Sequence, residues 1–248
     1  MIICLTGMHR SGTSLMSSYL EQCGISMGEK LVGPAKGNPR GHFEDIEFVE
    51  FHDGMLADNR CHMYNPRAHL TISPESHQTV ERLIDARKQK FARWGWKDPR
   101  TTLFLDLWSS HLPDIPFIFL YRHPQLVADS LFKRGTDRRL MLMPWLAYIA
   151  WIAYNARIVD FYKRHPSKCL VLNIQGVARK QKDAQKRLSQ FLGYSLDQPY
   201  STIYKQEEIS EEPRQRSLPR WILENMYEER LMSIYQSLES IAAIPEMP

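Results

Sequence analysis

Cysteine is scarce in this chain of 248 residues, and the few thiols present follow no metal-binding pattern. The chain contains Cys4, Cys23, Cys61 and Cys169. No two of them form a C-x-x-C pair, which argues against a zinc ribbon, and so few thiols do not make a disulfide scaffold at this length. We therefore expect reduced and mostly buried thiols.

Long hydrophobic runs and a strong charge of one sign are also missing. The longest apolar run, at residues 141–153, is too short to span a bilayer, and residues 1–6 lack the features of a signal peptide. The 32 Lys and Arg residues exceed the 28 Asp and Glu residues by only four. That net charge of +4 suits an anionic ligand but does not by itself indicate nucleic-acid binding. We expect a cytoplasmic protein with no transmembrane segment and no nucleic-acid partner.

The hydrophobic pattern predicts an α/β fold. Short apolar runs predict strands at 1–6, 94–97, 117–121 and 169–173. Helical spacing predicts helices at 13–23, 44–55, 74–93, 103–111, 124–133, 144–163, 180–192 and 218–241. Strands that are apolar throughout are typical of a parallel sheet covered by helices on both faces. We expect one domain over residues 1–248, built as a three-layer sandwich with a central parallel sheet.

The first chemical motif has the spacing of a phosphate-binding loop. Residues 7–14 read Gly-Met-His-Arg-Ser-Gly-Thr-Ser, between an expected strand and an expected helix. Backbone N–H groups of such a loop, together with the helix N-terminus, hold phosphate oxygens. The lysine of nucleotide-hydrolysing loops is replaced by Thr13, and the cation stands earlier, at Arg10. The candidate phosphate-binding residues are Arg10, Ser11, Gly12, Thr13 and Ser14.

A second anion site is predicted after the strand at 117–121. Arg122 follows this strand directly, Pro124 opens the next helix, and Ser130 lies about two turns along it. Ligands of open α/β sheets bind at the carboxyl ends of strands, so Arg122 and Ser130 are positioned to hold another phosphate. The strand ends without the acidic residue that would hold Mg²⁺ in a kinase or ATPase, which weakens those interpretations.

Taken together, the two motifs resemble the cofactor motifs of sulfotransferases that use 3′-phosphoadenylyl sulfate (PAPS). In that family, a motif like residues 10–14 binds the 5′-phosphosulfate, and a motif like Arg122-x-Pro124-x5-Ser130 binds the 3′-phosphate. The strand at 170–174 and the Phe-Leu-Gly at 191–193 are also similar, whereas the Gln-Gly at 175–176 departs from the family pattern. The resemblance implies a P-loop NTPase-like domain with about five parallel strands. It also implies direct in-line transfer of the sulfuryl group, without a required metal.

Sulfuryl transfer to an alcohol needs a base, and the Gly-His-Phe-Glu-Asp sequence at 41–45 is the best source of one. Family members use Glu or His at a comparable place, which makes Glu44 the first choice and His42 the second. Asp45 is a candidate to orient either base. The alternative is that Glu44 or Asp45 simply favours the start of the helix that follows.

Transfer also needs cations that stabilise developing charge. The Trp-Gly-Trp-Lys-Asp-Pro-Arg at 94–100 resembles the Lys-x-Pro segment of carbohydrate sulfotransferases, which implies that Lys97 stabilises the transferring group and Arg100 aids binding. Arg10 is assigned to the leaving phosphate and sulfuryl oxygens. Trp94 and Trp96 are expected in the core, with stacking on adenine as the alternative. A solvated turn is the alternative for Lys97.

Three functions stay open from the sequence. A PAPS-dependent sulfotransferase acting on a glycan, lipid or small-molecule alcohol is the leading hypothesis. The alternatives are a kinase that uses Mg·ATP on a small metabolite and a non-catalytic module that binds anions. The family often supplies late basic residues to the 3′-phosphate, which implies that the segment at 211–216, with its two arginines, folds over a bound cofactor; a solvated loop is the simpler interpretation.

Overall fold

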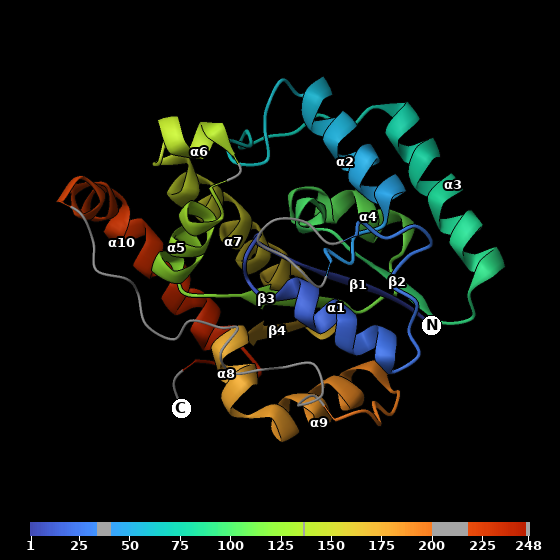
Figure 1. Cartoon of the computed structure of the whole chain (residues 1–248). Helices are drawn as coiled ribbons and strands as arrows, with labels where there is room; N and C mark the ends of the chain where they lie inside the picture. Colours follow the sequence, from blue (N-terminus) through green and yellow to red (C-terminus); the bar gives the residue numbers. More distant parts are fainter. Residues whose placement is uncertain (34–40, 136, 200–217, 247–248) are drawn as a thin grey trace.

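The computed structural model describes residues 1–33, 41–135, 137–199 and 218–246 (Figure 1). The strands are β1 (Ile2–Gly7), β2 (Trp94–Lys97), β3 (Phe117–Tyr121) and β4 (Cys169–Asn173). They form one sheet in the order β2-β1-β3-β4, and every neighbouring pair is parallel. The parallel sheet predicted from the apolar runs is therefore confirmed. In the described residues it has four strands rather than the five or so that the family resemblance implied.

Helices fill most of the connections between strands. The α-helices are α1 (Thr13–Gln22), α2 (Ile46–Asp58), α3 (Pro74–Lys90), α4 (Leu105–His111), α5 (Pro124–Arg134), α6 (Arg138–Leu142), α7 (Leu146–Arg164), α8 (Ile174–Arg179), α9 (Gln181–Leu192) and α10 (Leu218–Ile241). Two 3₁₀ turns, η1 (Pro99–Phe104) and η2 (Pro166–Lys168), precede α4 and β4. None of these helices is long and apolar enough to cross a membrane.

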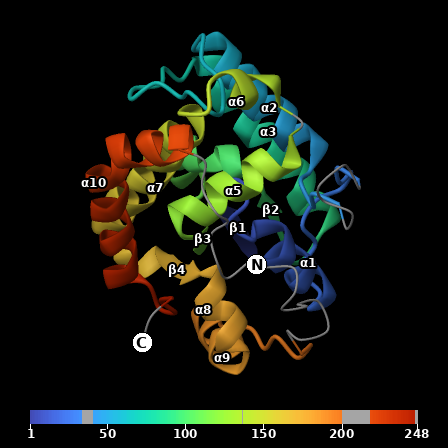
Figure 2. The same ribbon diagram turned by 60° about the vertical axis from the view of Figure 1, so that its left-hand side comes forward.

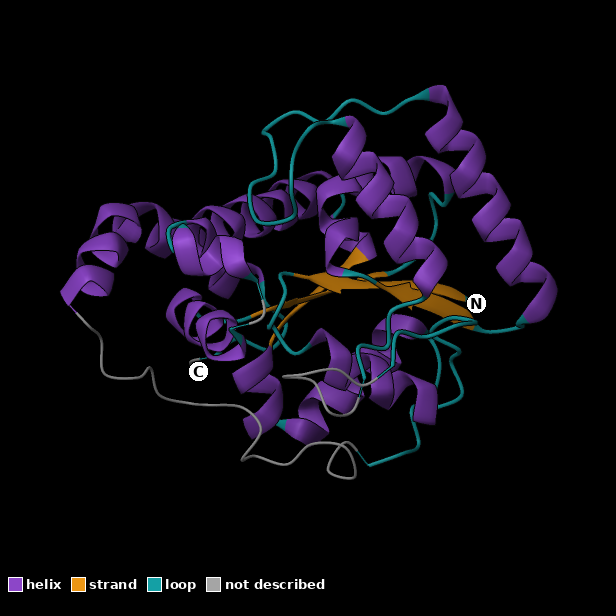
Figure 3. Ribbon diagram, turned by 45° about the horizontal axis from the view of Figure 1, so that its top comes forward, coloured by secondary structure: helices purple, strands orange, loops and turns teal. Residues whose placement is uncertain are grey.

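The helices lie in two layers, one on each face of the sheet (Figure 3). Successive side chains of a strand point to opposite faces, so Cys4 and Leu5 of β1 belong to different hydrophobic clusters. Leu5 packs with Ile118 of β3 and with residues of α1, α8 and α9. Cys4 packs with Phe117 of β3 in the larger cluster, which also holds α2, α3, α4, α5 and α7. Figure 2 shows α10 alongside α7, on the same side.

The strand order creates a switch point between β1 and β3. The chain leaves β1 toward β2 on one side of the sheet, and β3 lies on the other side. Loops that leave two such neighbouring strands diverge, which opens a space at the carboxyl ends of the strands. The loop after β1 and Arg122 after β3 both lie at this edge, because Gly7 is in register with Leu120.

Two short helices, α6 and α8, were missed by the sequence analysis because each is too short to show a period. Each begins at a polar residue that caps it: Asp137 accepts from the N–H of Arg139 for α6. Asn173 accepts from the N–H groups of Gln175 and Gly176 for α8. Asx residues at helix starts are the signal that could have located them.

Candidate active site

The loop after β1 has the geometry that a phosphate-binding loop requires. Gly7 has φ +145°, and a Cβ there would lie 2.0 Å from the carbonyl oxygen of Leu120, so only glycine fits. Gly12 has φ +86° and precedes α1 without any side-chain cap, which leaves the first N–H groups of that helix uncapped. Arg10 has φ +69°, a conformation that costs a residue with a Cβ about 1 kcal/mol or more.

The two predicted anion motifs meet directly. The Nε of Arg10 donates to the Oγ of Ser130 at 2.8 Å, across 120 residues of sequence. The Nη1 of Arg122 lies 3.5 Å from the carbonyl oxygen of Arg10. Burial lowers the pKa of the Arg10 guanidinium, and the nearby cation Arg134 lowers it further. Several cations crowded in a partly buried place favour an anionic ligand.

Polar atoms that lack a partner mark the same place. Ser11 lies in the phosphate-binding loop, and its Oγ is buried without a hydrogen-bond partner among the described residues. The Nε of Arg134, in the last turn of α5, is also buried without a partner there. Buried polar groups are normally hydrogen-bonded, so these atoms suit a polar ligand. Sequence analysis missed Arg134, which helical spacing from Ser130 could have placed beside the loop.

Lys97, Glu44 and His42, three candidates for the transfer chemistry, lie together in the structure. The Nζ of Lys97 lies 2.6 Å from the Oε1 of Glu44 and donates to the carbonyl oxygen of His42 at 2.8 Å. Ser14 of the phosphate loop donates to that same carbonyl at 3.2 Å, which ties this segment to the loop. Lys97 is only 2% exposed, so it is no solvated turn. Burial lowers the pKa of His42, which favours a neutral imidazole that can accept a proton.

Asp45 does not orient either base, and that prediction is wrong. Its Oδ2 accepts from Arg87 at 2.7 Å and from the N–H of Glu29 at 2.8 Å. Its Oδ1 accepts from the N–H of Glu47, which makes Asp45 the N-cap of α2. The alternative reading, that an acid here serves the helix start, is the one the structure supports.

The two tryptophans of β2 are core residues rather than a stacking surface. Trp94 is 2% exposed and Trp96 is fully buried. Trp96 packs against Trp108 of α4 with ring centroids 4.5 Å apart. Residues 211–216, considered above as a cover for the cofactor, lie outside the described residues.

A group that the sequence analysis passed over adjoins the phosphate loop. The ring of His9 lies 5.8 Å from that of Tyr64 and 5.9 Å from that of Tyr154. The Nε2 of His9 and the hydroxyl of Tyr154 are buried without a partner among the described residues. Burial lowers the pKa of His9 well below its usual value, and the nearby Arg100 lowers it further. His9 is therefore neutral in the folded chain near pH 7.

We expect this histidine to destabilise the fold in mild acid. The unfolded chain binds a proton at His9 near pH 6.5, whereas the folded chain binds it only at lower pH. Between these values the unfolded state holds more protons, so the free energy of unfolding falls as the pH falls. Denaturant titrations of wild type and H9Q from pH 7 to 5 should differ by a slope of up to about 1.4 kcal/mol per pH unit. Parallel pH profiles would show that His9 is not held neutral.

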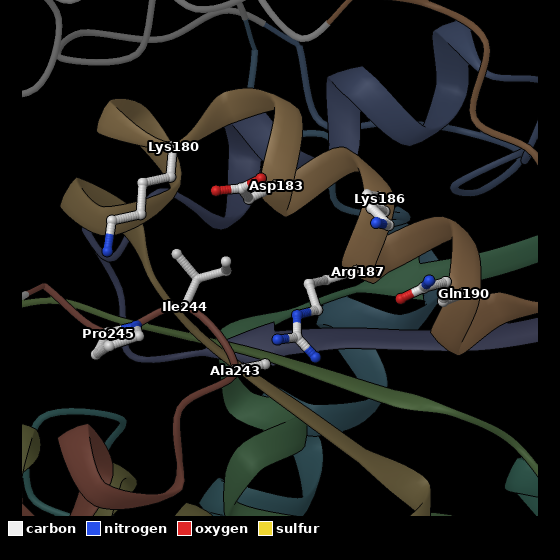
Figure 4. Close-up of a pocket in the computed structure, with 8 residues that line it drawn as sticks. All are labelled: Lys180, Asp183, Lys186, Arg187, Gln190, Ala243, Ile244 and Pro245. Atoms are coloured by element: carbon white, nitrogen blue, oxygen red, sulfur yellow. The ribbon is translucent and has the colours of Figure 1, made fainter. Parts of the chain in front are cut away.

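A separate hollow of about 550 Å³ lies between α9 and the segment that follows α10 (Figure 4). It is lined by Lys180, Asp183, Lys186, Arg187, Gln190, Ala243, Ile244 and Pro245. The charged residues of α9 that line it are exposed, whereas Ala184 and Leu188 of the same helix are buried. This arrangement is the solvated face of an amphipathic helix.

The family follows from the match of residues 3–198 to the model of the sulfotransferase family. The chain belongs to the sulfotransferase family. The matched region contains both anion motifs together with Glu44 and Lys97. The family resemblance drawn from the sequence is thereby confirmed. No curated protein matches the sequence.

Solved sulfotransferases share this fold at low sequence identity. STF9 from Mycobacterium avium is 14% identical, with a TM-score of 0.57 over 93% of this chain and 76% of that one. The sulfotransferase domain of the Synechococcus PCC 7002 olefin synthase is 17% identical, with a TM-score of 0.52 over 97% and 93%. A sulfotransferase from Alicyclobacillus acidocaldarius is 15% identical, with a TM-score of 0.53 over 96% and 94%. These likenesses confirm the P-loop-like α/β fold of this sulfotransferase.

Proposed function

We propose that this sulfotransferase uses PAPS as its donor and transfers the sulfuryl group to the hydroxyl of a glycan, a lipid or a small molecule. The observation that carries the proposal is the meeting of two anion motifs, in which Arg10 of the phosphate loop donates to Ser130. PAPS carries phosphate groups at both the 3′ and the 5′ position of its ribose, which accounts for two anion motifs in one site. We propose that the reaction takes place in the cytoplasm.

The residues of the loop fit the charge and shape of such a donor. The uncapped start of α1 and the orphaned hydroxyl of Ser11 suit the 5′-phosphosulfate, which Gly12, Thr13 and Ser14 would also contact. Arg122 and Ser130 would hold the 3′-phosphate. Arg10 belongs to the first motif and contacts Ser130 of the second, and its forked guanidinium is able to hold two oxygens at once. When bound, PAPS supplies an activated sulfuryl group with PAP (3′-phosphoadenosine 5′-phosphate) as the leaving group.

The proton of the acceptor hydroxyl must pass to a base of this chain. Glu44 is our first choice, because its carboxylate is held 2.6 Å from Lys97 beside the phosphate loop. His42 is the second, because it is a neutral imidazole attached to the same segment. Lys97 and Arg10 then stabilise the negative charge that develops on the transferring and bridging oxygens.

We expect the E44Q variant to bind PAP normally and to transfer slowly. Removing a general base typically costs about 10²–10⁴-fold in rate, whereas the amide keeps the size of the side chain. Transfer is measured from ³⁵S-labelled PAPS to a panel of glycans, lipid alcohols and small alcohols, and PAP affinity by calorimetry. The matched control is E50Q, which changes an exposed carboxylate on α2, the helix that follows Glu44.

H42Q separates the two candidate bases. Loss of transfer in H42Q with normal transfer in E44Q would assign the base to His42. Normal transfer in both variants would contradict a base from this segment. A wild type that binds PAP and transfers to nothing would favour the non-catalytic module.

A further inference from the structure

A chain of buried hydrogen bonds runs from α4 through α2 to the segment that follows β2. The indole Nε1 of Trp108 donates to the Nε2 of His52 at 2.9 Å. The Nδ1 of His52 lies 2.8 Å from the Oδ2 of Asp98. All three residues are fully buried, although 46 and 56 residues of sequence separate His52 from its two partners.

The donor at one end of the chain fixes the tautomer of the histidine. An indole N–H donates and cannot accept, so the Nε2 of His52 must carry a lone pair. The proton of a neutral imidazole then sits on Nδ1, where it is donated to Asp98. A proton on both nitrogens would set two donors against each other at Trp108. The hydrogen-bond chain therefore orients the imidazole of His52, with its Nδ1–H directed at the carboxylate.

The other oxygen of this carboxylate holds an arginine. The Oδ1 of Asp98 accepts from the backbone N–H of Arg100 at 2.9 Å and from its Nη1 at 3.0 Å. Burial alone would raise the pKa of Asp98, but Arg100 and His52 outweigh it and hold the pKa well below the usual range. Asp98 is thus a permanent carboxylate with a cation on one oxygen and an N–H on the other.

This arginine reaches the candidate catalytic carboxylate. The Nη1 of Arg100 lies 3.8 Å from the Oε2 of Glu44, whose other oxygen is paired with Lys97. Its Nε lies 2.6 Å from the Oδ1 of Asp53, one residue beyond His52 on α2. The same turn of α2 therefore supplies two of the groups that set where Arg100 points.

We propose that Trp108 and His52 are positioning residues for sulfuryl transfer: they fix Asp98, which aims Arg100 at the Glu44 carboxylate. The inference rests on the proposed function, because it assigns Glu44 and Arg100 to the transfer site. Packing alone does not account for this chain of hydrogen bonds. His52 is surrounded by the rings of Phe51, Phe104 and Trp108, where an apolar side chain would avoid burying polar atoms.

Two substitutions at His52 separate positioning from packing. H52L removes the N–H that Asp98 accepts, whereas H52N places an amide N–H near the position of Nδ1 and keeps that donor. The control is H77N, which changes an exposed histidine paired with His111. Release of PAP from PAPS is followed, because it counts transfer to every acceptor, water included. PAP affinity is measured on the same samples by calorimetry.

We expect H52L to lower kcat by about 10–100-fold, the cost of a misplaced group, with PAP affinity unchanged. H52N should recover most of that loss, and H77N should match the wild type. Wild-type turnover in H52L would overturn the proposal. An equal loss of turnover and of PAP affinity in H52L would also overturn the proposal, because it would indicate a general effect on the fold.

The tautomer provides a test that does not depend on turnover. In ¹⁵N-labelled protein at pH 8, the imidazole of His52 should show a protonated Nδ1 and an unprotonated Nε2. The W108F variant should lose this pattern. A protonated Nε2 in the wild type would show that the proposed hydrogen-bond chain through His52 is wrong. If the wild type binds PAP but never releases PAP from PAPS, the proposed function is contradicted. The tautomer of His52 would then still show whether the hydrogen-bond chain from Trp108 to Asp98 exists.

Discussion

Replacement of Lys97 by methionine is expected to slow sulfuryl transfer by about 10²–10³-fold and to destabilise the fold at the same time. Lys97 is buried, and its ammonium group is the cation nearest to Glu44, at 2.6 Å. Its loss removes charge stabilisation from the transfer step. Among the described residues, it also leaves a largely buried carboxylate with only the more distant Arg100 as an ion-pair partner, and breaking a buried ion pair costs about 3–5 kcal/mol.

A double variant separates these two effects. K97M/E44Q removes both charges, so the free energy of unfolding should recover most of the loss seen in K97M, measured by urea titration. Transfer should not recover, because both catalytic candidates are gone. K90M is the control, since the ammonium group of Lys90 pairs with Glu29 at the surface. A K97M variant that is as stable as wild type and transfers at the wild-type rate would refute both roles.

Replacement of Arg122 by alanine is expected to weaken strongly the preference for a nucleotide with a 3′-phosphate. A charge-assisted hydrogen bond is worth about 1.5–3 kcal/mol, which corresponds to about 10–100-fold in affinity. R122A should therefore bind PAP about 10–100-fold more weakly, while its affinity for 5′-AMP, which lacks the 3′-phosphate, should stay near the wild-type value. Calorimetric titrations with the two nucleotides give the comparison.

Two further variants complete this test. S130A should show a smaller loss of the same kind, because it removes a neutral hydroxyl rather than a cation. R138A changes an exposed arginine on α6 and should leave both affinities unchanged. An equal loss of PAP and 5′-AMP affinity in R122A would place Arg122 at the 5′-phosphate or in the fold rather than at the 3′-phosphate.

The sheet was predictable because its strands are short and wholly apolar. The strands at 94–97, 117–121 and 169–173 begin and end where the sequence analysis put them. Buried parallel strands show their limits as breaks in hydrophobicity, whereas helix ends depend on caps and on contacts from elsewhere. The helix predicted at 44–55 therefore begins later, at Ile46, because Asp45 is its cap. That residues 1–248 form one domain stays a prediction.

The sequence analysis named most residues of the candidate site but did not predict which of them contact one another. Gly7, Arg10 and Arg122 were located because strand ends place loops at one edge of a parallel sheet. The bond between Arg10 and Ser130 joins two groups that the sequence analysis assigned to different phosphates, and no local pattern encodes it. The pairing of Asp45 with Arg87, 42 residues away, is of the same kind.

Thermal unfolding with PAP and, separately, with Mg·ATP tests the central claim most directly. A ligand at 100 times its dissociation constant stabilises the fold by about 2.7 kcal/mol, or roughly 5–10 °C for a chain of this size. The two-phosphate site predicts a rise of this order with PAP and a smaller one with Mg·ATP. A rise with Mg·ATP alone would contradict the sulfotransferase donor site and assign the loop to a kinase.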